Sequence, residues 1–345
     1  MDDYRIVADP SPGAAYRDYV AGHPSARLYH RPEWSEMVRE TFGHPTRYFR
    51  VERNGAVEGI LPVTDFRSLL FGKLGVSLPF INYGGPLADS DAALAALMEH
   101  MRAYRDEAGY KSIELRLDRA LETDTPVKTH KVTFYLDLPA DPDALFGEFK
   151  AKLRSQIRRP TKDDMTGHRG GLDLLDEFYA VFAINMRDLG TPVLPRAFFR
   201  NILTTFPEDA HVIVVRTPEG EPAAAAFLLR HGTVMEIPWA SAVRTYNRSS
   251  PNMLAYWESL QLAIERGCTV FDFGRCSKEG GTYRFKKQWG SRESQLYWYY
   301  VLPEGEVLPE MSPDNPKYDR VIRVWQKLPL VVTNAVGPMI IRHIP

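Results

Sequence analysis

The segment FDFGRCSKEGGTYRFKKQWG, residues 271–290, combines residue types that could serve acyl transfer. An apolar, strand-like run ends at Gly274 and opens into a loop with the pair Gly280-Gly281, and such glycines let a backbone approach a ligand closely. Ligand sites of α/β sheets gather beyond the carboxyl ends of strands. Bulky and cationic side chains then alternate from Tyr283 to Trp289. A cation beside an aromatic wall could bind the carbonyl of an acyl donor and its developing oxyanion. The alternative is a surface hairpin with lysine stems lying along apolar surface.

A second group of residues is basic. The segment FKAKLRSQIRRPTKDD, residues 149–164, spaces four cations at steps of four, so that a helix would carry them on one face. They are Lys150, Arg154, Arg158 and Lys162, and Lys152 and Arg159 lie nearby. The row predicts an anion site suited to phosphates. The alternative is a solvated face paired with Asp163 and Asp164. We expect Pro160 to kink or end the helix, which would take Lys162 out of the row.

A third segment, MEIPWASAVRTYNRSSPNMLAYWE at 235–258, carries a strand into a polar loop and then a helix that begins at Pro251-Asn252. The free backbone N–H groups of a helix start could hold an anion or a carbonyl. By itself such a loop is a weak signal. Together with the late segment it supplies the candidate substrate pocket: Trp239, Ser241, Asn252, Tyr256 and Tyr283.

Several familiar signatures are missing from the sequence: GxGxxG, GxxxxGK[ST], HExxH, GxSxG and CxxC. The nine histidines show no ligand spacing, so we expect no metal site. Cys276 lies in the late loop, but no histidine is close enough in sequence to activate it as a nucleophile.

Composition limits the class of protein. The 345 residues suit two domains of ordinary size, and 44% hydrophobic with 25% charged residues is typical of a folded, water-soluble protein. A net charge of −1 gives no global attraction to nucleic acid or anionic lipid, so we expect no stable DNA partner. Two cysteines rule out a disulfide framework and suggest free thiols. No secretory signal or spanning stretch is evident, so a cytoplasmic location is expected.

The elements that must position these residues recur in two halves of the sequence. Hairpin-like runs surround Asn54-Gly55 and Glu219-Gly220. A helix-period segment follows each hairpin and ends at a capping glycine, Gly109 or Gly267, before a short strand. Aligning these glycines sets Glu114 opposite Asp272. We therefore predict an α/β fold made of two similar domains.

The domain limits follow from this repeat. A strand within THKVTFYLDLPADPD meets a Pro/Asp turn near residue 140, so we place the domains at 1–142 and 143–302. The second carries both the basic helix and the YRFKKQWG motif. Residues 303–345 are Pro-rich at first and then helix-like, and we expect this extension to pack back on the body of the protein.

At residues 271–290 and at KAKLRSQIRRPTK the sequence resembles the FemAB family of aminoacyl and acyl transferases. The resemblance is greatest to the branch associated with PEP-CTERM/exosortase systems in bacteria that make exopolysaccharide. Further matching stretches cover nearly the whole chain: SLPFINYGGPLAD, HKVTFYLDLP, FYAVFAINMRDLGTPV, MEIPWASAVRTYN, and LPLVV with VGP near the end. The resemblance implies two tandem GNAT-like domains with mixed sheets, and transfer of an acyl or aminoacyl group to an amine.

The family's residues carry over one by one. The Phe-Lys of its late motif lies at the catalytic centre and matches Phe285-Lys286, and its basic helix matches Lys152, Arg154, Arg158 and Lys162. We assign Lys286 to the carbonyl or oxyanion, Phe285 to the pocket wall, and Asp272 to orienting the amine or accepting its proton. The residues assigned to the phosphates of the donor are Lys152, Arg154, Arg158, Arg159, Arg275 and Arg284.

Two departures leave the donor open. The sequence has no Q/R-x-x-G-x-G/A pyrophosphate loop, which counts against ordinary CoA binding, and no evident helical arm such as some bridge-forming members carry. We expect no tightly bound cofactor, but a co-substrate that is either aminoacyl-tRNA or acyl-CoA. The acceptor is expected to be an amine-bearing saccharide, peptide or lipid-linked molecule of the cell envelope, peptidoglycan or exopolysaccharide.

Two alternatives remain. The chain could be a non-catalytic GNAT-fold module that binds an anionic saccharide or nucleotide-sugar through the basic helix. Separately, the apolar C-terminal stretch LPLVVTNAVGPMIIRHIP could contact the inner face of the membrane near a lipid-linked substrate. Because Pro329 and Pro338 interrupt it, packing against the first domain is the preferred expectation.

Overall fold

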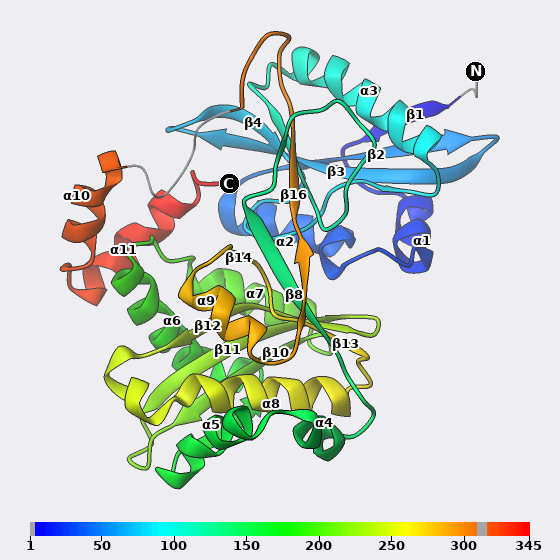
Figure 1. The fold of residues 1–345 in the computed structure, drawn as a ribbon. Helices are drawn as coiled ribbons and strands as arrows, with labels where there is room; N and C mark the ends of the chain where they lie inside the picture. Colours follow the sequence, from blue (N-terminus) through cyan, green and yellow to red (C-terminus); the bar gives the residue numbers. More distant parts are fainter. Residues whose placement is uncertain (1–3, 309–315) are drawn as a thin grey trace. The chain divides into compact units, whose positions relative to one another are not determined.

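The computed structural model describes residues 4–308 and 316–345, with side chains from Arg320 onward in the last part. The chain forms two compact units (Figure 1). Within the described residues, the first unit comprises 4–131, 295–308 and 342–345, and the second comprises 132–294 and 316–341. The units therefore differ from the continuous segments 1–142, 143–302 and 303–345 expected from the sequence, because pairing assigns two strands to the more distant unit in the chain.

The first unit is a mixed sheet with strand order β1-β2-β3-β4-β6-β16-β7. Its strands are β1 Arg5–Asp9, β2 Thr46–Arg53, β3 Ala56–Ser68, β4 Gly72–Val76, β5 Leu87–Ala88, β6 Ile113–Leu117, β7 Val127–Lys128 and β16 Tyr297–Val301. Its helices are α1 Ala14–Gly22, α2 Pro32–Phe42 and α3 Asp91–Ala108. The β2–β3 hairpin turns at Asn54 and Gly55, both with positive φ as a type I′ turn requires, and α3 ends at Gly109, so both predicted signals are confirmed.

The second unit has a sheet of order β9-β10-β11-β12-β13-β8-β14. Its strands are β8 Lys131–Asp137, β9 Thr166–Gly170, β10 Ala210–Arg216, β11 Pro222–His231, β12 Val234–Ala242, β13 Val270–Asp272 and β14 Cys276–Ser277, with β15 Arg292–Gln295 on β8. Its helices are α4 Pro142–Glu148, α5 Ala151–Lys162, α6 Leu175–Leu189, α7 Arg196–Thr205, α8 Pro251–Glu265, α9 Gly281–Lys287, α10 Pro316–Trp325 and α11 Leu330–Ile341. Helix α5 continues through Pro160, so Lys162 stays in the row, whereas Lys150 precedes the helix.

The two sheets repeat one topology, as the sequence predicted. In each, three antiparallel pairings lead to a parallel pair, β4 with β6 or β12 with β13. Glu114 pairs with Val76 in the first parallel pair, and Asp272 pairs with Glu236 in the second. The predicted equivalence of Glu114 and Asp272 is therefore confirmed by strand register.

The strand beside each parallel pair comes from the other half of the chain. Strand β8 follows the first unit in sequence but pairs with β13 of the second sheet. Strand β16 follows the second unit in sequence but pairs with β6 of the first sheet. The units thus exchange one strand each, which is why the chain-order domain limits do not describe them.

The parallel pair opens differently in the two units. In the first, the loop after β4 continues the ladder: Ser77 N donates to Glu114 O at 2.8 Å, and Gly85 N donates to Arg116 O at 2.9 Å. Arg116, only 2% exposed, fills the remaining space and donates to Glu114 Oε1 at 2.6 Å and to Ile81 O at 2.7 Å. The first unit is therefore closed at this point by a buried ion pair.

We expect Gly85→Ala to lower the free energy of unfolding by about 1–3 kcal/mol, because a Cβ at Gly85 would lie 2.8 Å from Arg116 O and force the loop away from β6. Chemical denaturation would measure the change. Gly22→Ala is the matched control, since a Cβ at Gly22 meets nothing within 4 Å. Equal stability of the two variants would contradict the close packing of this loop.

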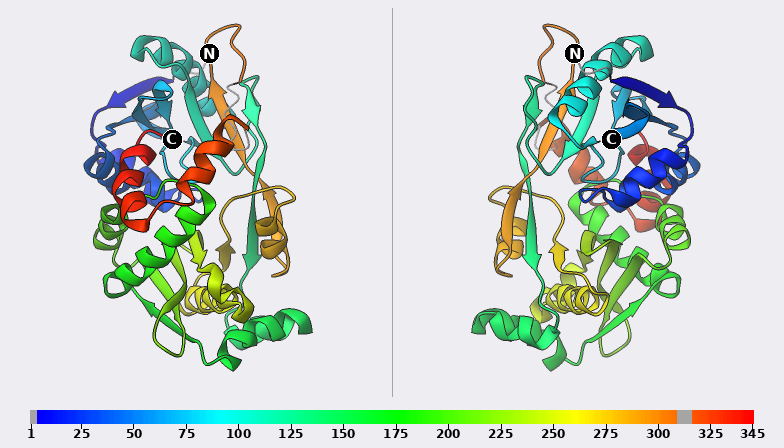
Figure 2. Two further views of the ribbon diagram at one scale, coloured as in Figure 1. Left: turned by 90° about the vertical axis from the view of Figure 1, so that its left-hand side faces the viewer. Right: turned by 90° about the vertical axis from the view of Figure 1, so that its right-hand side faces the viewer.

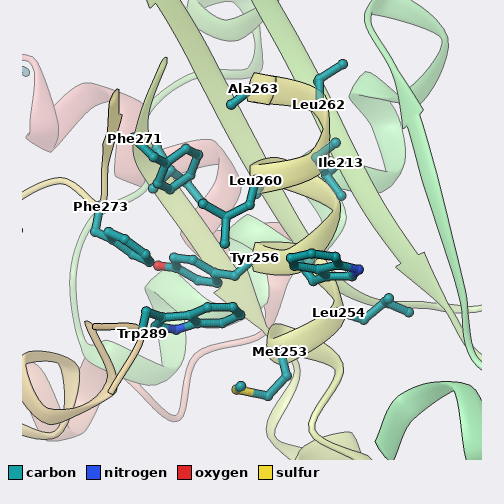
Figure 3. Packing of buried hydrophobic residues seen from close by; sticks show 14 of the residues in the cluster. Ile213, Met253, Leu254, Tyr256, Leu260, Leu262, Ala263, Phe271, Phe273 and Trp289 are labelled. Carbon is teal, nitrogen blue, oxygen red and sulfur yellow. The ribbon is translucent and has the colours of Figure 1, made fainter. Parts of the chain in front are cut away.

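Helix α8 covers one face of the second sheet and builds its core (Figure 3). Its ring-bearing face contributes Tyr256, whose ring lies 5.8 Å from that of Phe273 and 6.1 Å from that of Trp289. The opposite sheet face is covered by α6 and α7, where Phe199 contacts both Phe227 and Trp239. The parallel strands β12 and β13 therefore lie between two helical layers.

The C-terminal helices belong to the second unit, not to the first domain as we expected. Helix α11 contacts α6, and its residue Gly337 lies so close to Val193 that a Cβ would meet the backbone nitrogen at 2.9 Å. Only the last residues join the first unit, where Arg342 donates to Phe42 O and His44 Nε2 lies 2.8 Å from Arg342 O. Among the described helices, none has the length and apolar character to span a membrane.

Candidate active site

A buried group of charges lies at the carboxyl end of β13. Asp272 is fully buried and Glu236 is 5% exposed on the neighbouring strand. Lys286, 4% exposed, enters the same region from α9. Buried charges are costly unless they are paired or hydrogen-bonded, so such a group calls for a structural or chemical reason.

Strand alternation turns the two carboxylates to the same face. Phe271 and Phe273 pack in the core with α8, so Asp272 between them faces away from α8. Met235 and Ile237 also pack in that core, which turns Glu236 to the same side as Asp272. The alternation in β8 places Thr133 there as well, and its hydroxyl donates to Asp272 Oδ1 at 2.6 Å.

The turn after β13 is built around Asp272 and Lys286. Gly274, with φ +70°, donates its N–H to Asp272 Oδ1 at 2.8 Å. Lys286 Nζ donates to the carbonyls of Gly274 at 2.6 Å and Arg275 at 3.0 Å. An ammonium has three N–H donors, so these two bonds leave one for a further acceptor.

Burial lowers the pKa of Lys286 to about 8, even though the negative charges of Cys276, Asp272 and Glu236 act to raise it. Desolvation penalises the ammonium more than these neighbours stabilise it. The side chain is therefore mostly a cation at neutral pH and loses its charge within about one unit above it. A group that titrates this close to neutrality is suited to acid–base or oxyanion chemistry.

Beyond Glu236 and Asp272 the two parallel strands separate. Their pairing covers only Val234–Glu236 against Val270–Asp272, while β12 runs on to Ala242 along β11. Two residues of β12, Ile237 and Pro238, lie in a bulge opposite β11. The described hydrogen bonds include no rung like those of Ser77 and Gly85 across this gap. The second unit is thus open where the first is closed.

The basic helix α5 packs on α8, and its cations differ in their contacts. Arg154 donates to Gly147 O at 3.0 Å, and the guanidinium of Arg158 lies 4.9 Å from the ring centre of Phe146. Arg159 pairs with Asp163 at 3.1 Å, as the solvated-face alternative anticipated. Lys152 is exposed. The cations line one basic face, but half of their contacts are already made within the helix region.

The predicted pocket residues separate into three groups. Tyr256 and Phe285 belong with the core side of α8, where their rings lie 4.8 Å apart, and Tyr256 is only 8% exposed (Figure 3). Trp239 and Ser241 face α6 and α7, and Ser241 accepts from Asn185 at 3.1 Å. The others lie at the rims: Asn252 at the start of α8, Tyr283 on α9 bonded to Glu293, and Arg275 and Arg284 exposed.

Sequence reasoning missed Glu236 and Thr133. Glu236 is a single charged residue in the otherwise apolar run MEIPWA, and this pattern could have identified it as a buried carboxylate. Thr133 has no such signal, because a threonine in a strand is ordinary. Cys276 is buried, and the described residues include no group of His, Cys, Asp and Glu arranged to hold a metal ion.

Comparison with known proteins identifies this half of the chain. Residues 147–287 match the model of the acetyltransferase (GNAT) domain. A solved structure of FemX is similar at 17% identity over 85% of this chain and 97% of that chain, with a TM-score of 0.63. A tandem GNAT protein from the clavulanic acid biosynthesis pathway is similar at 11% identity over 87% and 100%, with a TM-score of 0.52.

The structure of L-PGS from Bacillus licheniformis is also similar, at 16% identity over 81% of this chain and 93% of that chain, with a TM-score of 0.52. A search of curated protein sequences finds no significant match. At these identities the structures show a shared fold, and the residues that resemble the acetyltransferase domain include every member of the buried charge group except Thr133.

Proposed function

The chain is an α/β protein with two tandem GNAT-like domains, and we propose that the second transfers an acyl or aminoacyl group from an activated donor to an amine. The observation that carries this proposal is the buried Asp272 and Lys286 at the open end of the β12–β13 pair, within the segment that matches an acetyltransferase domain. The acceptor is an amine of a cell-envelope or exopolysaccharide precursor, which follows the resemblance of the sequence to the PEP-CTERM-associated FemAB branch.

The chemistry needs two groups that this site supplies. The acceptor nitrogen attacks the carbonyl carbon of an ester or thioester, and negative charge develops on the carbonyl oxygen. The remaining N–H of Lys286 donates to that oxygen. Asp272 accepts the proton that the nitrogen loses, the bond from the carbonyl carbon to the leaving oxygen or sulfur breaks, and the leaving group takes up a proton.

The donor is recognised by the basic face of α5. Both candidate donors, aminoacyl-tRNA and acyl-CoA, carry phosphates, so cations serve either one. Of the residues assigned to this role, Lys152 and Arg158 are exposed. An open parallel pair with free backbone groups also suits an extended donor chain. These features support the proposal without deciding between the two donors.

We expect Lys152→Glu combined with Arg158→Glu to weaken donor binding by at least about tenfold, because two attractive charges become repulsive. Thermal-shift and turnover measurements with acetyl-CoA, longer acyl-CoAs and charged tRNA, each with an amine acceptor, would identify the donor and measure the loss. Arg200→Glu, on the exposed surface of α7, is the matched control.

The outcomes of this experiment separate the candidate functions. Turnover with one donor that falls in the α5 variant supports acyl or aminoacyl transfer. Binding of nucleotide-sugars with no turnover from any donor would contradict it and would instead fit a non-catalytic binding module. Equal loss in the Arg200 variant would remove α5 from donor recognition.

A further inference from the structure

Helix α11 exposes an entirely apolar strip. Successive residues of a helix turn by about 100°, so residues 331, 332, 335, 336 and 339 fall within one arc of about 140°. Val331 is 81% exposed and Met339 is 68% exposed, and Val332 and Val336 are each 39% exposed. Ala335 is the only other member of this arc and is also exposed. No polar side chain interrupts the strip.

The opposite side of α11 is fixed to the second unit. Thr333 is 2% exposed, and Gly337 lies against the backbone of Val193. Because these residues hold the helix on the protein, rotation of α11 cannot bury the strip. The strip is a fixed outer surface (Figure 2).

Helix α10, which precedes it in the chain, is amphipathic. Trp325 is buried, and Gln326 donates to Asp188 O at 3.1 Å, so this helix is also held on the second unit. Val321 is 64% exposed and Val324 is 57% exposed. By helical angle they lie next to a sector that carries three exposed cations, Arg320, Arg323 and Lys327.

The charge of this region has one sign. Residues 320–345 contain Arg320, Arg323, Lys327 and Arg342, and neither aspartate nor glutamate. Apolar side chains beside a row of cations are the features of helices that lie in the interface of an anionic membrane. A second copy of the chain would instead bring like charges together across the contact.

We propose that α10 and α11 form a docking surface for a bilayer of anionic phospholipid. The valines and Met339 enter the boundary between headgroups and acyl chains, and the cations contact the headgroup phosphates. The helices lie on the membrane and do not cross it. This inference is independent of the proposed transfer reaction, since it rests on a different surface.

The test is sedimentation of the full chain with vesicles of phosphatidylglycerol mixed with phosphatidylcholine, in the absence of any donor or acceptor. We expect binding that weakens with salt and is lost with pure phosphatidylcholine. Arg320→Glu, Arg323→Glu and Lys327→Glu together are expected to weaken binding about 100-fold, on the basis of the usual contribution of each surface cation. Val332→Glu with Val336→Glu is expected to weaken it at least about tenfold.

Leu69→Glu with Leu70→Glu is the matched control, because these residues are 88% and 65% exposed in the first unit and lie outside the surface. This control should bind vesicles as the unchanged chain does, and thermal melting should show that all variants fold. The proposal is overturned if the unchanged chain stays in solution with phosphatidylglycerol vesicles, or if the Val332 and Val336 variant binds them normally. A dimer that this variant dissociates, without any vesicle binding, would identify a second copy as the occupant.

Discussion

Replacing Lys286 by methionine is expected to lower kcat by about 10²–10³, the usual loss when one donor to a developing oxyanion is removed. Methionine keeps most of the buried volume. Two carbonyls lose their donor, but the protein no longer carries the cost of burying an ammonium whose pKa has fallen to about 8. These effects oppose each other, so the variant should fold, and circular dichroism and thermal melting would check this.

Lys287→Met is the matched control, because Lys287 is the exposed neighbour on the same helix. It should retain turnover. The pH profile gives a second readout. If the ammonium of Lys286 is the active form, turnover should fall as pH rises through about 8, and this limb should be absent from the residual activity of Lys286→Met. Full turnover in the folded Lys286 variant would remove Lys286 from the reaction.

Burial of Lys286 also predicts how stability changes with pH. In the unfolded chain the lysine keeps its ordinary value of 10.5, so between about pH 8 and 10.5 the unfolded state binds the extra proton. The penalty for the buried charge is full below pH 8 and is relieved across this range. The contribution of this residue to the free energy of unfolding therefore rises with pH, and Lys286→Met should lack the rise.

Asp272→Asn is expected to lower kcat by about 10²–10⁴, the range typical for loss of a general base. The substitution keeps Oδ1, so the bonds from Thr133 and from Gly274 N–H can remain. It removes the negative charge that accepts a proton and that raises the pKa of Lys286. Steady-state kinetics over a range of pH would measure both effects, with the high-pH limb moving to lower pH.

Thr133→Val serves as the comparison for Asp272→Asn, because it removes one hydrogen bond to Asp272 and leaves the charge. A purely structural role for Asp272 predicts similar losses in the two variants and no movement of the high-pH limb. A role in proton transfer predicts a much larger loss in Asp272→Asn. An unchanged kcat in the folded Asp272 variant would exclude the proposed base.

The fold was accessible from sequence where the signal is local. Positive-φ glycines cap or turn the chain at Gly55 and Gly109 because few other residues adopt that backbone conformation, and apolar periodicity identified α3 and α8. The partner of a strand is not a local property. Both β8 and β16 read as strands, but no pattern within them indicates which sheet they join. The expected domain limits failed at these two strands.

The candidate site shows the same division. The equivalence of Glu114 and Asp272 could be predicted because glycines mark the register of each half. The burial of Lys286 could not, since it adjoins the exposed Lys287 and both lysines read as surface residues. The closure of the first unit depends on Arg116, two residues after Glu114, and an Arg in a strand gives no indication that it will be buried.

The exchanged strands also bear on how the chain is made. During synthesis the first sheet has β1 to β6 early, but Ile113 must wait for Val301 before its outer edge is covered. Such a distant pairing is slow to close and leaves a strand edge exposed in the meantime. The nascent first unit therefore stays incomplete until nearly the whole chain has emerged from the ribosome. A cut between residues 131 and 132 would give two fragments that each lack a strand, and neither would be expected to fold alone.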